Sequence, residues 1–133
     1  MNPYTFHWED RKLTISFSGK ITLMDAFRVC DDRTADHRFD TVKFIVNDLS
    51  EVDEIQFDDT KIKNALVYAN QSQFFCRNHE VLVAFVATKE CVREKVKQFL
   101  DFANETSPNW ERRLFVSREA ANEWAAQKMK SSE

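Results

Sequence analysis

The sequence predicts an α/β domain with a mixed, mostly parallel sheet of about five strands, an N-terminal β-hairpin and about four helices. Short apolar runs alternate with amphipathic segments of helical period, which is typical of strands joined by helical crossovers. Residues 81–87 are uninterrupted apolar residues, as expected of a central strand covered on both faces. With 133 residues, 43% of them hydrophobic and 13% aromatic, residues 1–133 can form a single domain with a substantial core.

The first two strands are predicted by alternation of apolar and polar residues. Residues 4–8 and 13–17 alternate on either side of a short charged turn, which is the pattern of a hairpin. The second run places Leu13, Ile15 and Phe17 on one face. We expect that face to be the buried one.

The next two elements are a helix and a buried strand. Thr22 and Asp25 have capping-box spacing ahead of apolar residues at helical intervals, which predicts a helix over residues 22–35. Residues 41–47 carry apolar side chains on both parities, which predicts a strand with cover on both faces.

A second helix is predicted over residues 59–73, from an apolar stripe at helical spacing. Phe74 and Phe75 are expected to close that helix against the core. The strand at 81–87 follows.

The C-terminal third contains a long helix, a short strand and a last helix. Thr88 is the predicted cap of the long helix, which Ser107-Pro108 ends. A short strand follows at 113–116, and Ser117 is placed to cap the last helix.

Charge and glycine content exclude several function classes. A net charge of −3 and a pI near 5.7 provide no cationic surface for phosphate backbones, so no nucleic-acid partner is expected. Gly19 is the only glycine, which excludes a glycine-rich phosphate-binding loop. No apolar run approaches the roughly 18 residues of a membrane span.

Cysteine and histidine placement predicts neither a disulfide framework nor a metal site. Cys30, Cys76 and Cys91 are odd in number and lack C-x-x-C spacing, and the three histidines are scattered. We therefore expect reduced thiols, a cytoplasmic protein and no cofactor. Cys30 falls on an apolar stripe, and Cys91 is expected to be a packed or boundary thiol rather than a reactive one.

The most informative segment joins the strand at 41–47 to the helix at 59. Apolar residues stop at Asn47, an acidic stretch follows, and the helix begins at Asp58-Asp59-Thr60. Two interpretations stay open: a solvated loop with ordinary capping residues, or a docking surface for a basic partner. The candidate interaction residues are Asp48, Ser50, Glu51, Asp58, Asp59, Thr60 and Lys61.

Element order and these motifs resemble the bacterial SpoIIAA-like proteins, which are related to STAS domains and anti-sigma-factor antagonists. The antagonists have a D-L-S-like strand end, matched here by 48–50, and a D-S-S-G-type helix start, matched by 58–61. The resemblance implies phosphorylation at a serine there. In this chain Asp59 stands near that serine, so a switch would fall on Thr60 or on Ser50.

These observations predict a non-enzymatic regulatory or protein-interaction module that docks a partner through residues 48–61. The resemblance implies a regulatory kinase or an anti-sigma-like protein as that partner. The alternative is a carrier or sensor of a small apolar ligand, because STAS-like folds resemble the lipid-binding Sec14 type and the chain has twelve phenylalanines. The sequence does not distinguish a filled interior from a hollow one, nor does it define an oligomeric state.

Overall fold

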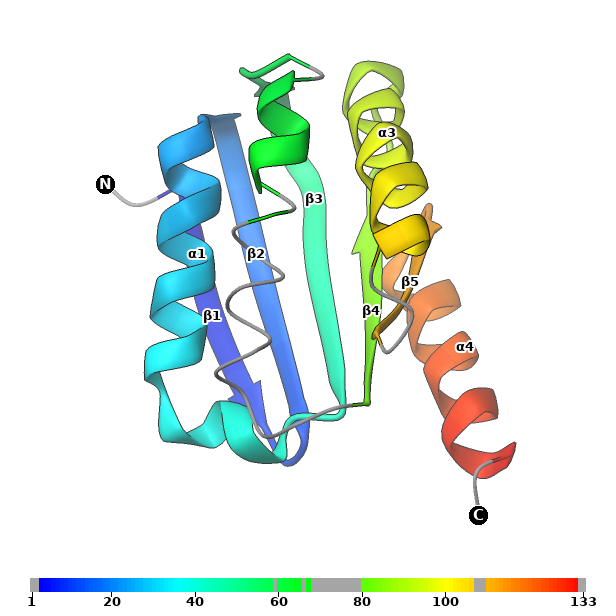
Figure 1. Cartoon of the computed structure of the whole chain (residues 1–133). Helices are drawn as coiled ribbons and strands as arrows, with labels where there is room; N and C mark the ends of the chain where they lie inside the picture. Colours follow the sequence, from blue (N-terminus) through cyan, green and yellow to red (C-terminus); the bar gives the residue numbers. More distant parts are fainter. Residues whose placement is uncertain (1–2, 59, 66, 68–79, 107–109, 132–133) are drawn as a thin grey trace.

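The computed structural model describes residues 3–58, 60–65, 67, 80–106 and 110–131. Their strands form one five-stranded sheet in the order β1-β2-β3-β4-β5 (Figure 1). β1 and β2 are antiparallel, whereas the other three neighbouring pairs are parallel. The predicted fold class, a mostly parallel sheet led by a hairpin, is confirmed.

Helices and strands alternate after the hairpin. Residues 60–65 are also helical and are called the short helix below. The strands are β1 (Tyr4–Glu9), β2 (Lys12–Ile21), β3 (Phe44–Ile55), β4 (Val81–Val86) and β5 (Trp110–Phe115). The helices are α1 (Leu23–Ala35), the 3-10 helix η1 (His37–Thr41), α3 (Glu90–Thr106) and α4 (Arg118–Ser131). Phe74 and Phe75 lie outside the described residues.

Helices cover the two faces of the sheet unequally (Figure 1). The larger apolar cluster joins the sheet to α1, η1 and α3, with Val29, Phe39 and Val96 among its buried members. A smaller cluster on the opposite face joins β3 and β4 to α4 through Phe44 and Trp124, whose ring centroids are 6.5 Å apart. Both faces of the central strands are therefore buried, which explains their continuous apolar sequences.

The hairpin follows the predicted alternation. Leu13 and Ile15 are fully buried and Phe17 nearly so, which confirms the predicted inner face. Arg11 occupies the turn with φ of 61°. Thr5, His7 and Glu9 alternate with less exposed residues on β1, and all three are exposed.

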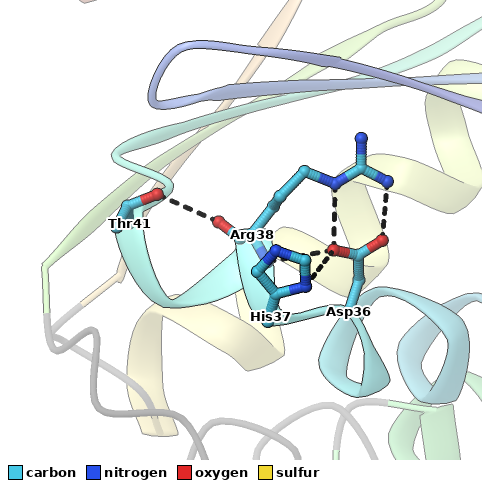
Figure 2. A network of polar contacts seen from close by, with 4 residues as sticks. All are labelled: Asp36, His37, Arg38 and Thr41. Carbon is cyan, nitrogen blue, oxygen red and sulfur yellow. Dashed lines mark hydrogen bonds and ion pairs between the residues drawn. The ribbon is translucent and has the colours of Figure 1, made fainter.

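The 3-10 helix η1 is organised by one carboxylate (Figure 2). Asp36 accepts hydrogen bonds from the backbone N–H and the guanidinium of Arg38, at 2.7–3.0 Å. Thr41 donates its hydroxyl proton to the carbonyl of Arg38 at 3.1 Å. The hydrogen bonds from Arg38 lower the pKa of Asp36 to about 2. This compact turn carries Phe39 into the core.

Two of the three predicted helix caps are present. The Thr22 hydroxyl accepts a hydrogen bond from the backbone N–H of Asp25 at 3.2 Å. In return, the Asp25 carboxylate accepts one from the backbone N–H of Thr22 at 2.9 Å. Ser117 accepts from the backbone N–H of Ala120 at 3.2 Å. The prediction for Thr88 is wrong. A cap at Thr88 would start the helix at Lys89, but α3 starts at Glu90, and the carbonyl of Lys89 accepts the first helical hydrogen bond.

β3 is much longer than predicted. The acidic stretch expected to be a loop continues the strand as far as Ile55, paired with the extended end of β2. The register contains two irregularities, and at each of them β3 has one more residue than β2. After these bulges Val52 and Ile55 follow Leu49 onto the core side at intervals of three residues. A search for strict alternation therefore misses this half of the strand.

Candidate functional site

Asp48 is a structural residue rather than part of an exposed surface. Its side chain lies in the sheet, and the residue is only 8% exposed. One carboxylate oxygen accepts from the guanidinium of Arg118 on α4, and the other accepts from the backbone N–H of Ser50 at 3.0 Å. Arg118 also donates to the hydroxyl of Ser16 at 3.0 Å. Asp48 therefore connects β3 to β2 and α4, which corrects its prediction as a docking residue.

The environment of Asp48 shifts its pKa. Burial raises the pKa, but hydrogen bonds from Ser50 and Arg118, together with the charge of Arg118, outweigh that effect. The pKa of Asp48 consequently lies below its usual value, and the carboxylate is ionised at neutral pH.

The end of β3 carries the exposed carboxylates. Glu51, Asp53 and Glu54 are exposed, whereas Ser50 is half-buried. Asp53 accepts from the ammonium of Lys89 at 2.6 Å, and this hydrogen bond lowers the pKa of Asp53. The acidic surface is thus smaller than predicted and is partly neutralised.

Asp58 caps the short helix. Its carboxylate accepts from the backbone N–H of Lys61 at 3.1 Å, and its carbonyl accepts from that of Ile62 at 2.9 Å. Thr60 and Lys61 are exposed on the first turn. Asp59 lies outside the described residues. The helix start that we predicted from sequence is confirmed, and its first carboxylate is used for capping.

A cavity of about 150 Å³ lies against the larger apolar face of the sheet. α1, the short helix and α3 form its walls, and residues of β2, β3 and β4 form its floor. The apolar lining residues are Phe17, Ile21, Ala26, Val29, Cys30, Leu49, Ile55, Phe57, Ile62, Ala65, Phe85, Val96 and Phe99. A cavity with such walls suits an apolar molecule of about the size of benzene.

Three polar side chains also line the cavity: Arg33 from α1, Asn47 from β3 and Lys95 from α3. Arg33 and Asn47 are buried, at 7% and 6% exposed, and Lys95 is half-buried. Sequence reasoning missed all three. Arg33 follows Ala26 by seven residues and Val29 by four, so the stripe that identified the helix already placed it on the buried face.

The described thiols differ in exposure. Cys30 is buried in α1, as the apolar stripe predicted, and it lines the cavity. Cys91 is exposed, which corrects its prediction as a packed thiol, and its Sγ lies 3.7 Å from the Asp53 carbonyl. Cys76 lies outside the described residues.

Neither a metal-binding cluster nor a membrane-spanning helix is present among the described residues. In the described ranges, no group of three His, Cys, Asp or Glu side chains is arranged to hold a metal ion. No helix among those described has both the length and the apolar content needed to cross a bilayer.

A hairpin-led, mostly parallel sheet with helices on both faces defines a SpoIIAA-like α/β domain. A crystal structure of an uncharacterised DUF3478-family protein with a SpoIIAA-like fold, from Shewanella loihica PV-4, matches this chain with a TM-score of 0.55 and 17% identity. The match covers 91% of this chain and 90% of the other. The fold is therefore SpoIIAA-like, as the sequence resemblance implied.

A second solved structure, described as Mglu, matches with a TM-score of 0.47 and 20% identity over 65% of this chain. The present chain spans only 20% of that protein. No protein-family model and no curated protein matches the sequence.

Proposed function

We propose that this protein is a non-enzymatic module that binds a small apolar ligand in the cavity between α1 and α3. The observation that carries the proposal is a space of about 150 Å³ whose lining is almost entirely apolar. A concave apolar surface of this size favours an apolar molecule, because burying apolar area against it removes that area from water. A ligand there would also gain contacts with the surrounding aromatic and aliphatic side chains.

The identity of the walls supports binding rather than catalysis. Aromatic and aliphatic side chains supply contact area, and the few polar groups are positioned to orient a ligand. Asp48 is the buried carboxylate nearest in sequence to the residues of the cavity floor. It is already hydrogen-bonded to Arg118 and Ser50. It is therefore not free to act as a general acid or base.

Amide NMR titration with toluene tests this proposal. Toluene should shift the resonances of cavity-lining residues such as Val29, Leu49 and Val96, and leave those of Ala121 and Ala125 on the opposite face unchanged. Native mass spectrometry of gently purified protein should also show a bound small molecule. Absence of toluene-induced shifts at the cavity would refute ligand binding there.

A second candidate function is docking of a protein partner through the acidic end of β3 and the start of the short helix. The exposed carboxylates of Glu51, Glu54 and Asp58 favour it, because like charges gathered at one end of a sheet attract a basic surface. Phosphorylation of Thr60, which is exposed, or of Ser50 would add further negative charge there. A regulatory kinase or an anti-sigma-like protein is the partner that the resemblance implies.

The double substitution Glu51→Lys, Glu54→Lys tests docking. It should abolish capture of a partner while the melting temperature stays within about 2 °C, as is usual for surface changes. Lys20→Glu, on the neighbouring strand, is a control that adds acidic charge to the same end of the sheet. Capture that survives the double substitution would rule out this surface.

A further inference from the structure

Arg33 is a buried cation of the cavity wall with a side-chain donor that the described residues leave unsatisfied. It lies in the last turn of α1, lines the cavity and is 7% exposed. Its Nε is buried and has no hydrogen-bond partner among the described residues. An arginine side chain has five N–H donors, and leaving one without a partner in a dry environment is unfavourable. A ligand acceptor that pairs with this guanidinium would offset that cost.

Aromatic rings hold the guanidinium of Arg33 in place. Its Cζ lies 5.4 Å from the ring centroid of Phe39 and 5.3 Å from that of Trp110. These cation–π contacts stabilise the charge, but rings cannot accept its in-plane N–H bonds in the manner of a carboxylate. The guanidinium is thus held beside two rings before any ligand binds.

Two further cations lie near Arg33. Arg112 on β5 is also buried, at 7% exposed, and donates to the carbonyl of Trp110 at 3.2 Å. Burial and the positive charge of Arg33 lower the pKa of Arg112 to about 10. Lys95 adds a further cation to the cavity wall, and no carboxylate is among the described lining residues. The electrostatic potential in the cavity therefore favours an anion.

We propose that the cavity binds a small apolar carboxylic acid, with its hydrocarbon part among the phenylalanines and its carboxylate paired with Arg33. The inference rests on the proposed ligand-binding function and specifies the ligand's head group. Carboxylate geometry suits it, because two oxygens can accept in parallel from Nε and one terminal nitrogen of a guanidinium. A single aromatic ring or a short alkyl chain fits a volume of about 150 Å³.

Three ring compounds of nearly equal shape and different charge provide the test: benzoate, benzamide and benzamidinium. Benzoate should bind at least about tenfold more tightly than benzamide, and benzamidinium should bind most weakly. NMR should show the Arg33 Nε–H resonance shifting on addition of benzoate. That readout reports contact at the guanidinium itself, which a general effect on stability would not produce.

Variants of α1 separate charge from packing. Arg33→Gln should bind benzoate no more tightly than benzamide, and Arg33→Lys should retain part of the preference for benzoate because it keeps the charge without the planar fork. Arg28→Gln is the matched control, since Arg28 lies on the same helix with a side chain 60% exposed, and it should leave all three affinities unchanged. If Arg33→Gln fails to fold, the Lys variant and the wild-type preference decide the question.

The outcomes separate the two proposals. Equal wild-type affinity for benzoate and benzamide overturns the carboxylate assignment but leaves apolar binding intact. Binding of benzoate without movement of the Arg33 resonance also overturns it. If neither the three ring compounds nor toluene binds, the ligand-binding function itself is wrong.

Discussion

Two regions of the molecule carry groups of charged residues: the acidic end of β3 and the cavity beneath α1. They differ in whether the charged side chains have hydrogen-bond or ion-pair partners within the protein. Of the acidic residues, Asp48 pairs with Arg118, Asp53 with Lys89, and Asp58 caps a helix. In the cavity, Arg33 has a buried Nε that none of the described residues satisfies.

This difference shows why charge density alone is a weak guide to function. A run of carboxylates is prominent in sequence, yet each described aspartate in it already has a partner within the fold. A single arginine on an apolar helix stripe is inconspicuous, but burial makes its unsatisfied donor costly. The cavity is therefore the stronger candidate site, and four predictions probe the contrast.

The largest expected effect is on ligand binding when the cavity is filled. Ala26 lines the cavity, and Ala26→Phe would place a ring in the space that a ligand would occupy. We expect the affinity for benzoate to fall at least about thirtyfold, with a change in unfolding free energy of no more than about 1–3 kcal/mol. Isothermal titration calorimetry and urea unfolding measure the two quantities.

Met24→Phe is the control for that substitution, because Met24 lies on the same helix and is 56% exposed. It should leave benzoate affinity unchanged. Retained binding by the Ala26 variant would place the ligand elsewhere.

The next largest effect distinguishes two aspartates of β3. Asp48→Asn should lower the unfolding free energy at pH 7 by about 1–2 kcal/mol, because it removes a charged hydrogen-bond acceptor from a mostly buried site. The loss is limited because Arg118 keeps some access to water. Asp53→Asn should cause no measurable loss, since its ion pair with Lys89 is exposed. Equal losses in urea unfolding would contradict the structural role given to Asp48.

The same residue should produce a pH dependence of stability. The pKa of Asp48 is lower in the folded protein than the usual value near 3.9, so its contribution is fully present above that value. The contribution is lost as pH falls through the folded-state pKa. Urea unfolding from about pH 6 down to pH 2 should therefore show wild type and Asp48→Asn converging in stability. Parallel curves would mean that the pKa of Asp48 is unchanged by folding.

The smallest effect concerns the start of the short helix. Asp58→Ala should cost about 0.5–1 kcal/mol, because it removes the acceptor for the backbone N–H of Lys61. Asp58→Ser preserves a capping oxygen and should recover most of that loss. Hydrogen exchange at Lys61 and Ile62 measures the local effect, and equal exchange in both variants would show that the cap is unimportant.

Local patterns in the sequence account for much of the fold. Alternation around Arg11 predicted the hairpin and its buried face, and the spacing of Thr22 and Asp25 predicted the start of α1. These features depend on neighbours within a few residues, so their physical causes are visible in a short window. The alternation of strands and helices then limited the topology to a mostly parallel sheet.

The candidate site depends on contacts that no short window contains. The second half of β3 is a strand because the extended end of β2 pairs with it, and two bulges keep its apolar residues facing the core. Arg118 lies 70 residues from Asp48 in sequence, yet it satisfies that carboxylate.

The sequence by itself determined the class of fold, the hairpin with its buried face and two helix caps, because propensity, periodicity and capping act locally. Only the tertiary structure decided which charges are satisfied and where the core is hollow. Trp110 and Phe39 come from separate elements, and together they hold Arg33 at the cavity wall. Whether a buried charge has a partner depends on every element packed around it, which is a property of the whole fold.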